Sequence, residues 1–276
     1  MDSQPRIVLN DQNRIPQLGL GVWRTPDDQA GPAVEAALAA GYRHIDTAAV
    51  YENETGVGAG IRAAGLPRRQ LFITTKLWNP DQGYDSTLKA FDASLARLGL
   101  DDIDLYLIHW PSPARGLYLE SWRAMRRLHE EGRVRSIGVS NFAAEHLERL
   151  IQDSGVVPVL NQIELHPRFQ QRTLRDFHAR HGIATQSWSP LGQGTLLDDP
   201  VITAIGRKHG RTPAQVIIRW HLDNGLIAIP KSVTPSHIAE NFNVFSFRLD
   251  ADDRSAIAAL DTPDGRIGPD PLTAEF

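Results

Sequence analysis

The chain has 276 residues, of which 41% are hydrophobic and 22% are charged, with a net charge of −4 and no cysteine. The lack of cysteine excludes a disulfide scaffold, a thiolate nucleophile and cysteine-ligated metal sites, and the mildly acidic balance argues against a nucleic-acid partner. No apolar run has the length of a membrane span, and the first ten residues lack the apolar core of a signal peptide, so we expect a cytoplasmic protein with no membrane partner.

Short apolar segments alternate with helical segments along most of the chain. Residues 6–9 and 14–17 flank a polar turn and predict an N-terminal β-hairpin. Apolar runs predict eight further strands, at 18–22, 43–46, 71–77, 103–108, 134–139, 159–163, 183–187 and 226–229. Helices are expected at 26–40, 53–64, 84–98, 121–131, 143–154, 172–181, 200–208, 213–224, 236–241 and 250–260.

This alternation of strands and helices predicts an α/β fold with a parallel sheet. Eight such units in about 260 residues match a (β/α)8 TIM barrel, here with an N-terminal hairpin. A doubly wound sheet is the alternative, but Gly19 and Gly21 are followed by Arg24 where its phosphate-binding turn needs a third glycine. No linker divides the chain, so we expect residues 1–276 to form a single barrel domain.

Ionisable side chains follow consecutive predicted strands. Asp46 ends the second strand, Lys76 lies near the end of the third, and His109 follows the fourth; Tyr51 comes five residues after Asp46. Each alone has an ordinary structural explanation, such as a turn cap, a half-buried aromatic, a surface charge or a core histidine. The carboxyl ends of barrel strands converge, however, and a lysine after an apolar strand needs a partner that Asp46 would supply.

These four side chains suit proton delivery to a carbonyl oxygen. Tyrosine has an ordinary pKa near 10, and a neighbouring ammonium favours its ionised form and lowers that pKa. A carboxylate behind Lys76 would keep the ammonium charged, and His109 would orient the carbonyl. None of these groups supplies an electron pair, so a hydride donor must bind nearby.

Several motifs then point to one family. Residues 41–54 read GYRHIDTAAVYENE and are followed by Gly-Val-Gly, and residues 105–111 read LYLIHWP. Further segments are GVSNF at 138–142, NQIELHP at 161–167, and IPKS at 229–232 continuing to Glu240 and Asn241. In this order and spacing the chain resembles the aldo-keto reductase family, and it looks most similar to the prokaryotic diketogluconate reductase-like members.

The resemblance implies a barrel that binds NADPH without a Rossmann fold and reduces aldehydes or ketones to alcohols. It implies a catalytic tetrad of Asp46, Tyr51, Lys76 and His109, with Tyr51 as general acid. It also implies that Ser140, Asn141 and Gln162 hold the carboxamide and that Trp188 stacks on the nicotinamide. The remaining implied cofactor contacts are Val22, Trp23, Ser189, Pro190, Leu191, Gln193, Lys231, Ser232, Val233, Thr234, His237, Glu240 and Asn241.

The chain departs from the family pattern at His237, where the family usually has arginine. Arginine offers a permanently charged fork to a 2′-phosphate, whereas histidine is mostly uncharged at pH 7. We therefore expect NADPH to be the first cofactor but with a weaker preference over NADH than is usual.

Tryptophans after the early strands predict an apolar pocket. Trp23, Trp78 and Trp110 would form its walls, beside Tyr51 and His109, and would admit a small carbonyl compound, possible examples being diketones and keto-sugars. The short Gly/Pro-rich tail after residue 261 resembles that of family members with open pockets. The resemblance also favours a monomer.

Two other functions compete with carbonyl reduction. A metal-dependent barrel hydrolase would draw ligands from His44, Asp46, His109 and His166, although the chain contains no His-x-His pair and we expect no metal. A sensor module that binds NADPH with little turnover would have no need of an acid tuned by a lysine.

Overall fold

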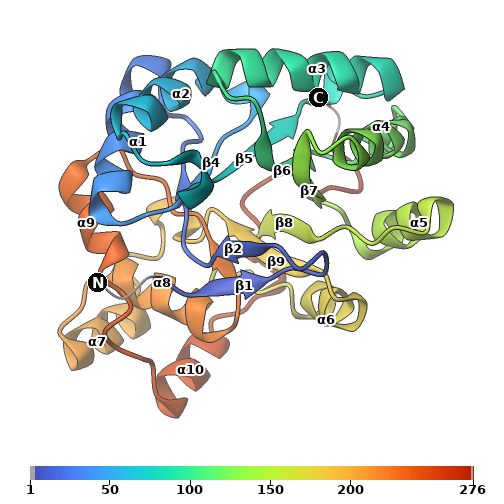
Figure 1. Cartoon of the computed structure of the whole chain (residues 1–276). Coiled ribbons are helices and arrows are strands. Elements are labelled where there is room, and N and C mark those ends of the chain that lie inside the picture. The colour runs from blue at the N-terminus through green and yellow to red at the C-terminus, as the bar shows by residue number, and fades with distance from the viewer. Residues whose placement is uncertain (1–3, 275) are drawn as a thin grey trace.

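A parallel sheet closed into a barrel forms the centre of the molecule, and helices cover its outer side (Figure 1). The computed structural model describes residues 4–274 and 276. Within them the parallel sheet has eight strands: β3 (Leu20–Gly21), β4 (His44–Asp46), β5 (Phe72–Leu77), β6 (Ile103–Ile108), β7 (Val134–Ser140), β8 (Leu160–Glu164), β9 (Ala184–Trp188) and β10 (Ile227–Ala228). The strands pair in sequence order from β3 to β10.

The first and last strands meet and close the barrel. Leu18 and Ala228 form one parallel bridge, and Gly21 and Lys231 form another. The amide of Gly19 donates to the carbonyl of Ala228 at 2.9 Å. The backbone groups at both edges of the sheet are thereby paired, which excludes the open, doubly wound alternative.

Helices follow the strands around the barrel. They are α1 (Asp27–Ala40), α2 (Glu54–Ala63), α3 (Tyr84–Leu98), α4 (Tyr118–Glu130), α5 (Ala144–Ser154), α6 (Arg172–His181), α7 (Pro200–His209), α8 (Pro213–Asp223), α9 (Pro235–Phe242) and α10 (Ala251–Ala258). Several end at a glycine in the left-handed region, for example α3 at Gly99, where φ is 65°.

The N-terminal hairpin closes the end of the barrel from which the strands start. Its strands are β1 (Arg6–Val8) and β2 (Arg14–Pro16), which pair antiparallel. Leu9 and Ile15 are buried against inward-facing residues that include Leu105 and Leu107 of β6. Because apolar side chains fill this end, we expect a ligand to bind at the opposite end, where the strands finish.

The structure confirms the predicted barrel, its hairpin and the order of its elements, with small shifts at the boundaries. The helix predicted at 121–131 starts three residues earlier, at Tyr118. That side chain is buried and packs edge-on against Phe142, with ring centroids 5.4 Å apart, so a tertiary contact extends the helix into a segment whose local sequence indicated a loop. No helix in the described part of the chain combines the length and apolar character needed to cross a bilayer.

Candidate active site

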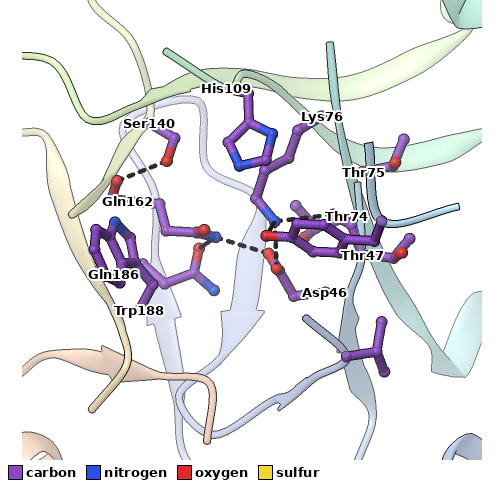
Figure 2. A network of polar contacts seen from close by, with 12 residues as sticks. Asp46, Thr47, Thr74, Thr75, Lys76, His109, Ser140, Gln162, Gln186 and Trp188 are labelled. Carbon is purple, nitrogen blue, oxygen red and sulfur yellow. Dashed lines mark hydrogen bonds and ion pairs between the residues drawn. The ribbon is translucent and has the colours of Figure 1, made fainter. Parts of the chain in front are cut away.

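The four ionisable residues singled out in the sequence meet at the carboxyl ends of the strands. Asp46 ends β4, Lys76 lies in β5, His109 follows β6, and Tyr51 ends the short 3-10 helix η1 (Ala49–Tyr51). The Nζ atom of Lys76 donates to Oδ1 of Asp46 at 2.5 Å, to the carbonyl of Thr47 at 2.9 Å and to Oη of Tyr51 at 3.4 Å. Figure 2 shows Lys76 and Asp46 side by side at the centre of this network.

Lys76 is a buried, charged group whose donors all have partners. Burial by itself lowers the pKa of a lysine, but the Asp46 carboxylate outweighs this effect and the pKa of Lys76 is raised. Lys76 therefore remains an ammonium at neutral pH. Its three hydrogen bonds use all three of its protons, so its position beside Tyr51 is fixed.

The phenol of Tyr51 is less acidic than the sequence suggested. Burial raises the pKa of Tyr51, and the ammonium of Lys76 opposes this shift without cancelling it. The expectation of a lowered pKa is thus wrong in this structure, because the energetic cost of burying a phenolate exceeds the attraction of Lys76. Tyr51 consequently holds its proton at neutral pH, as a proton donor must.

His109 is an uncharged neighbour of Tyr51. Burial, together with the charge of Lys76, holds the pKa of His109 well below its usual range. The His109 ring stands edge-on to Tyr51 and to Trp78, with centroids 5.6 and 5.3 Å away. A neutral imidazole in this position can orient a carbonyl oxygen by a hydrogen bond, whereas the proton itself must come from Tyr51.

Amide side chains from the following strands lie beside Tyr51, Lys76 and Asp46, which together we call the acid group. Gln162 of β8 donates to Oδ2 of Asp46 at 2.7 Å (Figure 2). Trp188, at the end of β9, donates from Nε1 to Oδ1 of Asn141 at 2.8 Å. Asn141 also donates to the carbonyl of His109 at 3.0 Å. These bonds join the ends of β6 to β9 into one polar wall.

Two adjoining hollows open above these residues. The first, about 650 Å³, contains the acid group and the tryptophans Trp23, Trp78, Trp110 and Trp188. The second, about 540 Å³, extends past Leu191 to Lys231, Ser232, His237, Glu240 and Asn241. The two share the lining residues Trp23, Arg24, Ser189, Pro190, Gln193 and Lys231, so they form one continuous cleft.

The residues of this cleft fit a nicotinamide dinucleotide. One end has an indole and amide groups beside the acid, as a nicotinamide requires, and the other end has exposed cationic and hydroxyl groups for phosphate. Lys231 is exposed, and within residues 4–274 and 276 no carboxylate lies within ion-pair distance of it. Its charge is therefore available to an anionic ligand.

A few of the predicted cofactor residues do not line either hollow. Val22 is buried in the hydrophobic core, and Ser140 stands behind Asn141 and donates to the carbonyl of Gln162 at 2.8 Å. Val233 and Thr234 follow Ser232 but are absent from the lining. Ser140 thus supports the wall, and any contact of the other three with a cofactor would lie outside the two hollows.

The cleft also contains residues that the sequence analysis missed. Arg24 lines both hollows, with its guanidinium carbon 4.1 Å from the Trp23 ring centroid. Ile267, Gly268, Pro269 and Phe276 of the C-terminal segment line the first hollow. The C-terminal segment thus forms part of the wall of the first hollow, which the sequence analysis did not anticipate. Only the tertiary path of the chain reveals these contacts, although the charge of Arg24 beside a strand end was a usable signal.

Glu164 of β8 holds the C-terminal segment in place. Its two carboxylate oxygens accept from the amides of Ile267, at 2.5 Å, and Gly268, at 2.8 Å. Its third partner is Nε2 of His166 at 3.1 Å. A side chain at position 268 would have its Cβ only 2.5 Å from the Trp188 indole, so glycine is required there.

The structure gives no support to the alternative of a metal-dependent hydrolase. In the described part of the chain no three His, Asp or Glu side chains converge in a way that could hold a metal ion. His166 is paired with Glu164, and Asp46 is occupied by Lys76 and Gln162.

Comparisons with known proteins agree with this geometry. The model of the "Aldo/keto reductase family" matches residues 16–262. An aldo-keto reductase of Mycolicibacterium smegmatis is 60% identical over 272 residues, covering 99% of this chain and 98% of that protein. A methylglyoxal reductase, DkgA, of Escherichia coli is 55% identical over 267 residues and covers 96% of each chain.

A solved structure, of a Gox0644 mutant in complex with NADPH, has a TM-score of 0.96 and 56% identity, with both chains fully covered. The family model and the relatives each span nearly the whole barrel, including every strand end of the site. The chain belongs to the aldo/keto reductase family of NAD(P)H-dependent oxidoreductases, as its motifs indicated.

Proposed function

We propose that this protein reduces small aldehydes and 2-oxoaldehydes with NADPH and that Tyr51 is the proton donor. The observation that carries this proposal is the contact of Tyr51 with a buried ammonium, Lys76, which is itself paired with Asp46. This arrangement lies on the floor of a cleft of suitable shape for a dinucleotide and a small carbonyl compound.

The chain's residues divide the work of binding between the two ends of the cleft. Trp188 and Gln162 would face the nicotinamide, and Lys231, Ser232 and His237 would hold the adenosine phosphate. When bound, NADPH supplies the hydride that the protein itself lacks. NADPH is supported by the complex of the Gox0644 mutant, whose chain is 56% identical to this one.

The protein's part in the reaction is to position the carbonyl and to move one proton. His109 donates a hydrogen bond that orients the carbonyl oxygen toward Tyr51. The Tyr51 hydroxyl then gives its proton to that oxygen, and Lys76 stabilises the negative charge that forms on the phenol. Asp46 keeps Lys76 charged throughout, so the acid group returns to its starting state once the phenol regains a proton.

The pocket favours small substrates. Its walls are the rings of Trp23, Trp78 and Trp110, and Phe276 narrows it further. The methylglyoxal reductase of E. coli, at 55% identity, acts on a three-carbon 2-oxoaldehyde according to its name. We therefore expect methylglyoxal and similar compounds to be better substrates than branched ketones or keto-sugars.

The test is a panel of 2-oxoaldehydes, simple aldehydes, diketones and keto-sugars, followed by the loss of NADPH absorbance, with the wild type and Tyr51→Phe in parallel. The variant should lose about 100-fold or more in kcat, the usual contribution of general acid catalysis, and should bind NADPH as tightly as the wild type. Undiminished turnover by Tyr51→Phe would refute the role of Tyr51, and a wild type inert toward every carbonyl would leave the sensor alternative.

We also propose that the chain forms one domain and acts as a cytoplasmic monomer. Barrel closure joins Leu18 and Gly21 to Ala228 and Lys231, segments about 210 residues apart in sequence, which supports a single folding unit. Light scattering coupled to gel filtration should give a mass near 30.6 kDa, and cell fractionation should recover the activity in the cytoplasmic fraction.

A further inference from the structure

Gln186 is a buried amide on β9 that the reaction itself does not use. Its Oε1 accepts a hydrogen bond of 2.9 Å from Nε2 of Gln162 (Figure 2). We infer that Gln186 is a positioning residue, which fixes the amide of Gln162 in the orientation that receives the nicotinamide carboxamide. This inference rests on the binding of a nicotinamide cofactor beside Gln162.

The orientation of Gln162 follows from a count of its protons. Nε2 carries two protons, and they go to Oδ2 of Asp46 at 2.7 Å and to Oε1 of Gln186 at 2.9 Å. The reverse orientation would place the Gln162 oxygen against both of these oxygens. Gln162 therefore presents only its Oε1 to the cleft, as an acceptor for the N–H groups of a carboxamide.

Gln186 is held in turn by His44 of β4. The Nε2 atoms of the two side chains are 3.5 Å apart, and Oγ1 of Thr74 is 3.3 Å from the same imidazole nitrogen. Burial lowers the pKa of His44 to about 3, so the ring is neutral. Because the Gln186 nitrogen can only donate, a hydrogen bond between the two side chains requires Nε2 to be the unprotonated ring nitrogen of His44. A Cβ at Gly19 would lie 2.6 Å from the ring, so the imidazole packs directly on that backbone.

The result is a chain of fixed groups across the barrel interior. It runs from His44 through Gln186 and Gln162 to Asp46, and from there to Lys76. If Gln186 lacked an acceptor, one proton of Gln162 would be unpaired in a buried site, and only the bond to Asp46 would hold the amide. The amide plane could then turn about that one bond, so Oε1 of Gln162 would no longer be fixed toward the carboxamide.

The experiment compares Gln186→Met and Gln186→Glu with the wild type. Methionine retains the length of the side chain without an acceptor of comparable strength, whereas glutamate retains an oxygen toward Gln162. Binding of NADPH and of 2′,5′-ADP, which has no nicotinamide, is measured by quenching of tryptophan fluorescence. The neighbouring Ser187→Ala is the matched control, since the Ser187 hydroxyl is buried and has no hydrogen-bond partner in the described structure.

Gln186→Met should bind NADPH about tenfold more weakly, the scale of one buried hydrogen bond, while its Kd for 2′,5′-ADP stays within about twofold. Gln186→Glu should restore most of the NADPH affinity, and its added negative charge should shift the acid limb of the kcat profile to higher pH.

Equal losses for both ligands would show a merely structural role and overturn the inference, as would unchanged NADPH binding in Gln186→Met. If that variant does not fold, Gln186→Asn, which withdraws the acceptor by one methylene, is measured by the same criteria. Absence of NADPH binding by the wild type would instead refute the proposed function, so the two failures are distinguishable.

Discussion

Phe276 stacks on the indole of Trp78, with ring centroids 5.9 Å apart and planes 10° from parallel. It also stands edge-on to Trp110, at 5.1 Å. Two residues far apart in sequence thereby build one apolar wall, and that wall belongs partly to the barrel and partly to the C-terminal segment. The size of substrate that the enzyme accepts should depend on this contact.

Replacement of Phe276 by alanine should widen the pocket. We expect kcat/KM for bulky aromatic or branched aldehydes to rise about tenfold, the scale of a few methylene groups in an apolar pocket, with little change for methylglyoxal. Leu272→Ala is the control, since that side chain is exposed and does not line the pocket. Equal changes for small and bulky aldehydes would show that Phe276 does not limit size.

Loss of the Lys76 ammonium should affect both stability and chemistry. Lys76→Met leaves the buried Asp46 carboxylate without its cation, which should cost about 3–5 kcal/mol in the free energy of unfolding. The pKa of Tyr51 should rise further, because Lys76 is the group that opposes the effect of burial. The double variant with Asp46→Asn should recover much of the stability but not the activity, as urea unfolding and steady-state kinetics would show.

Lys208→Met provides the comparison for this pair of measurements. Lys208 also forms ion pairs with Asp250 and Asp253, but its side chain is exposed. Its loss should cost much less stability than the loss of Lys76, because solvent screens an exposed ion pair. A Lys76→Met variant as stable and active as Lys208→Met would contradict the role given to the buried ammonium.

A change of His237 to arginine should strengthen the preference for NADPH. His237 lines the second hollow with Lys231 and Ser232, where a 2′-phosphate would lie. A charged hydrogen bond from arginine should raise the NADPH to NADH ratio of kcat/KM about tenfold or more. The constants for NADH should stay near those of the wild type, and a gain shared equally by both cofactors would place His237 away from the phosphate.

Buried histidines should make the protein sensitive to mild acid. Burial lowers the pKa of His44, His178 and His221 to about 3 each. Below pH 6.5 the unfolded chain binds protons that the folded chain refuses, so stability is fully present above that pH and is lost as the pH falls toward 3. Each histidine should contribute about 0.7 kcal/mol per pH unit at pH 6.5, rising toward about 1.4 kcal/mol per pH unit near pH 5.

Urea unfolding at pH values from 7.5 to 5.5 measures this slope. His178→Asn removes one of these titrating groups and should reduce the slope by about 0.7 kcal/mol per pH unit at pH 6.5 and by about 1.2 kcal/mol per pH unit at pH 5.5. A wild-type slope near zero between pH 6.5 and 5.5 would mean that these rings are protonated in the folded state.

Much of the fold was predictable from the sequence, because each unit carries its own local signals. The helix at Tyr84–Leu98 was predicted to the residue, since its amphipathic pattern stops at Gly99. The meeting of Asp46, Lys76 and His109 was also predictable, because strand ends of a barrel converge.

Features that depend on the tertiary path of the chain were not predictable. Gln186 has the sequence pattern of any polar residue in a strand, and only its distance from Gln162 gives it a role. The contribution of Ile267, Gly268, Pro269 and Phe276 to the pocket wall has no local signal either. The same holds for the acidity of Tyr51, since its pKa reflects how far burial outweighs Lys76.

Glu164 accepts hydrogen bonds from the backbone amides of Ile267 and Gly268. This anchor separates changes to the barrel and its catalytic residues from changes to the C-terminal segment that lines the pocket. Upstream of it, the chain is committed to the barrel and its chemistry. Downstream of it, residues can be exchanged, inserted or deleted while the anchor stays fixed. Substitutions in the C-terminal segment after the Glu164 anchor would thus change the range of substrates and leave the catalytic residues as they are.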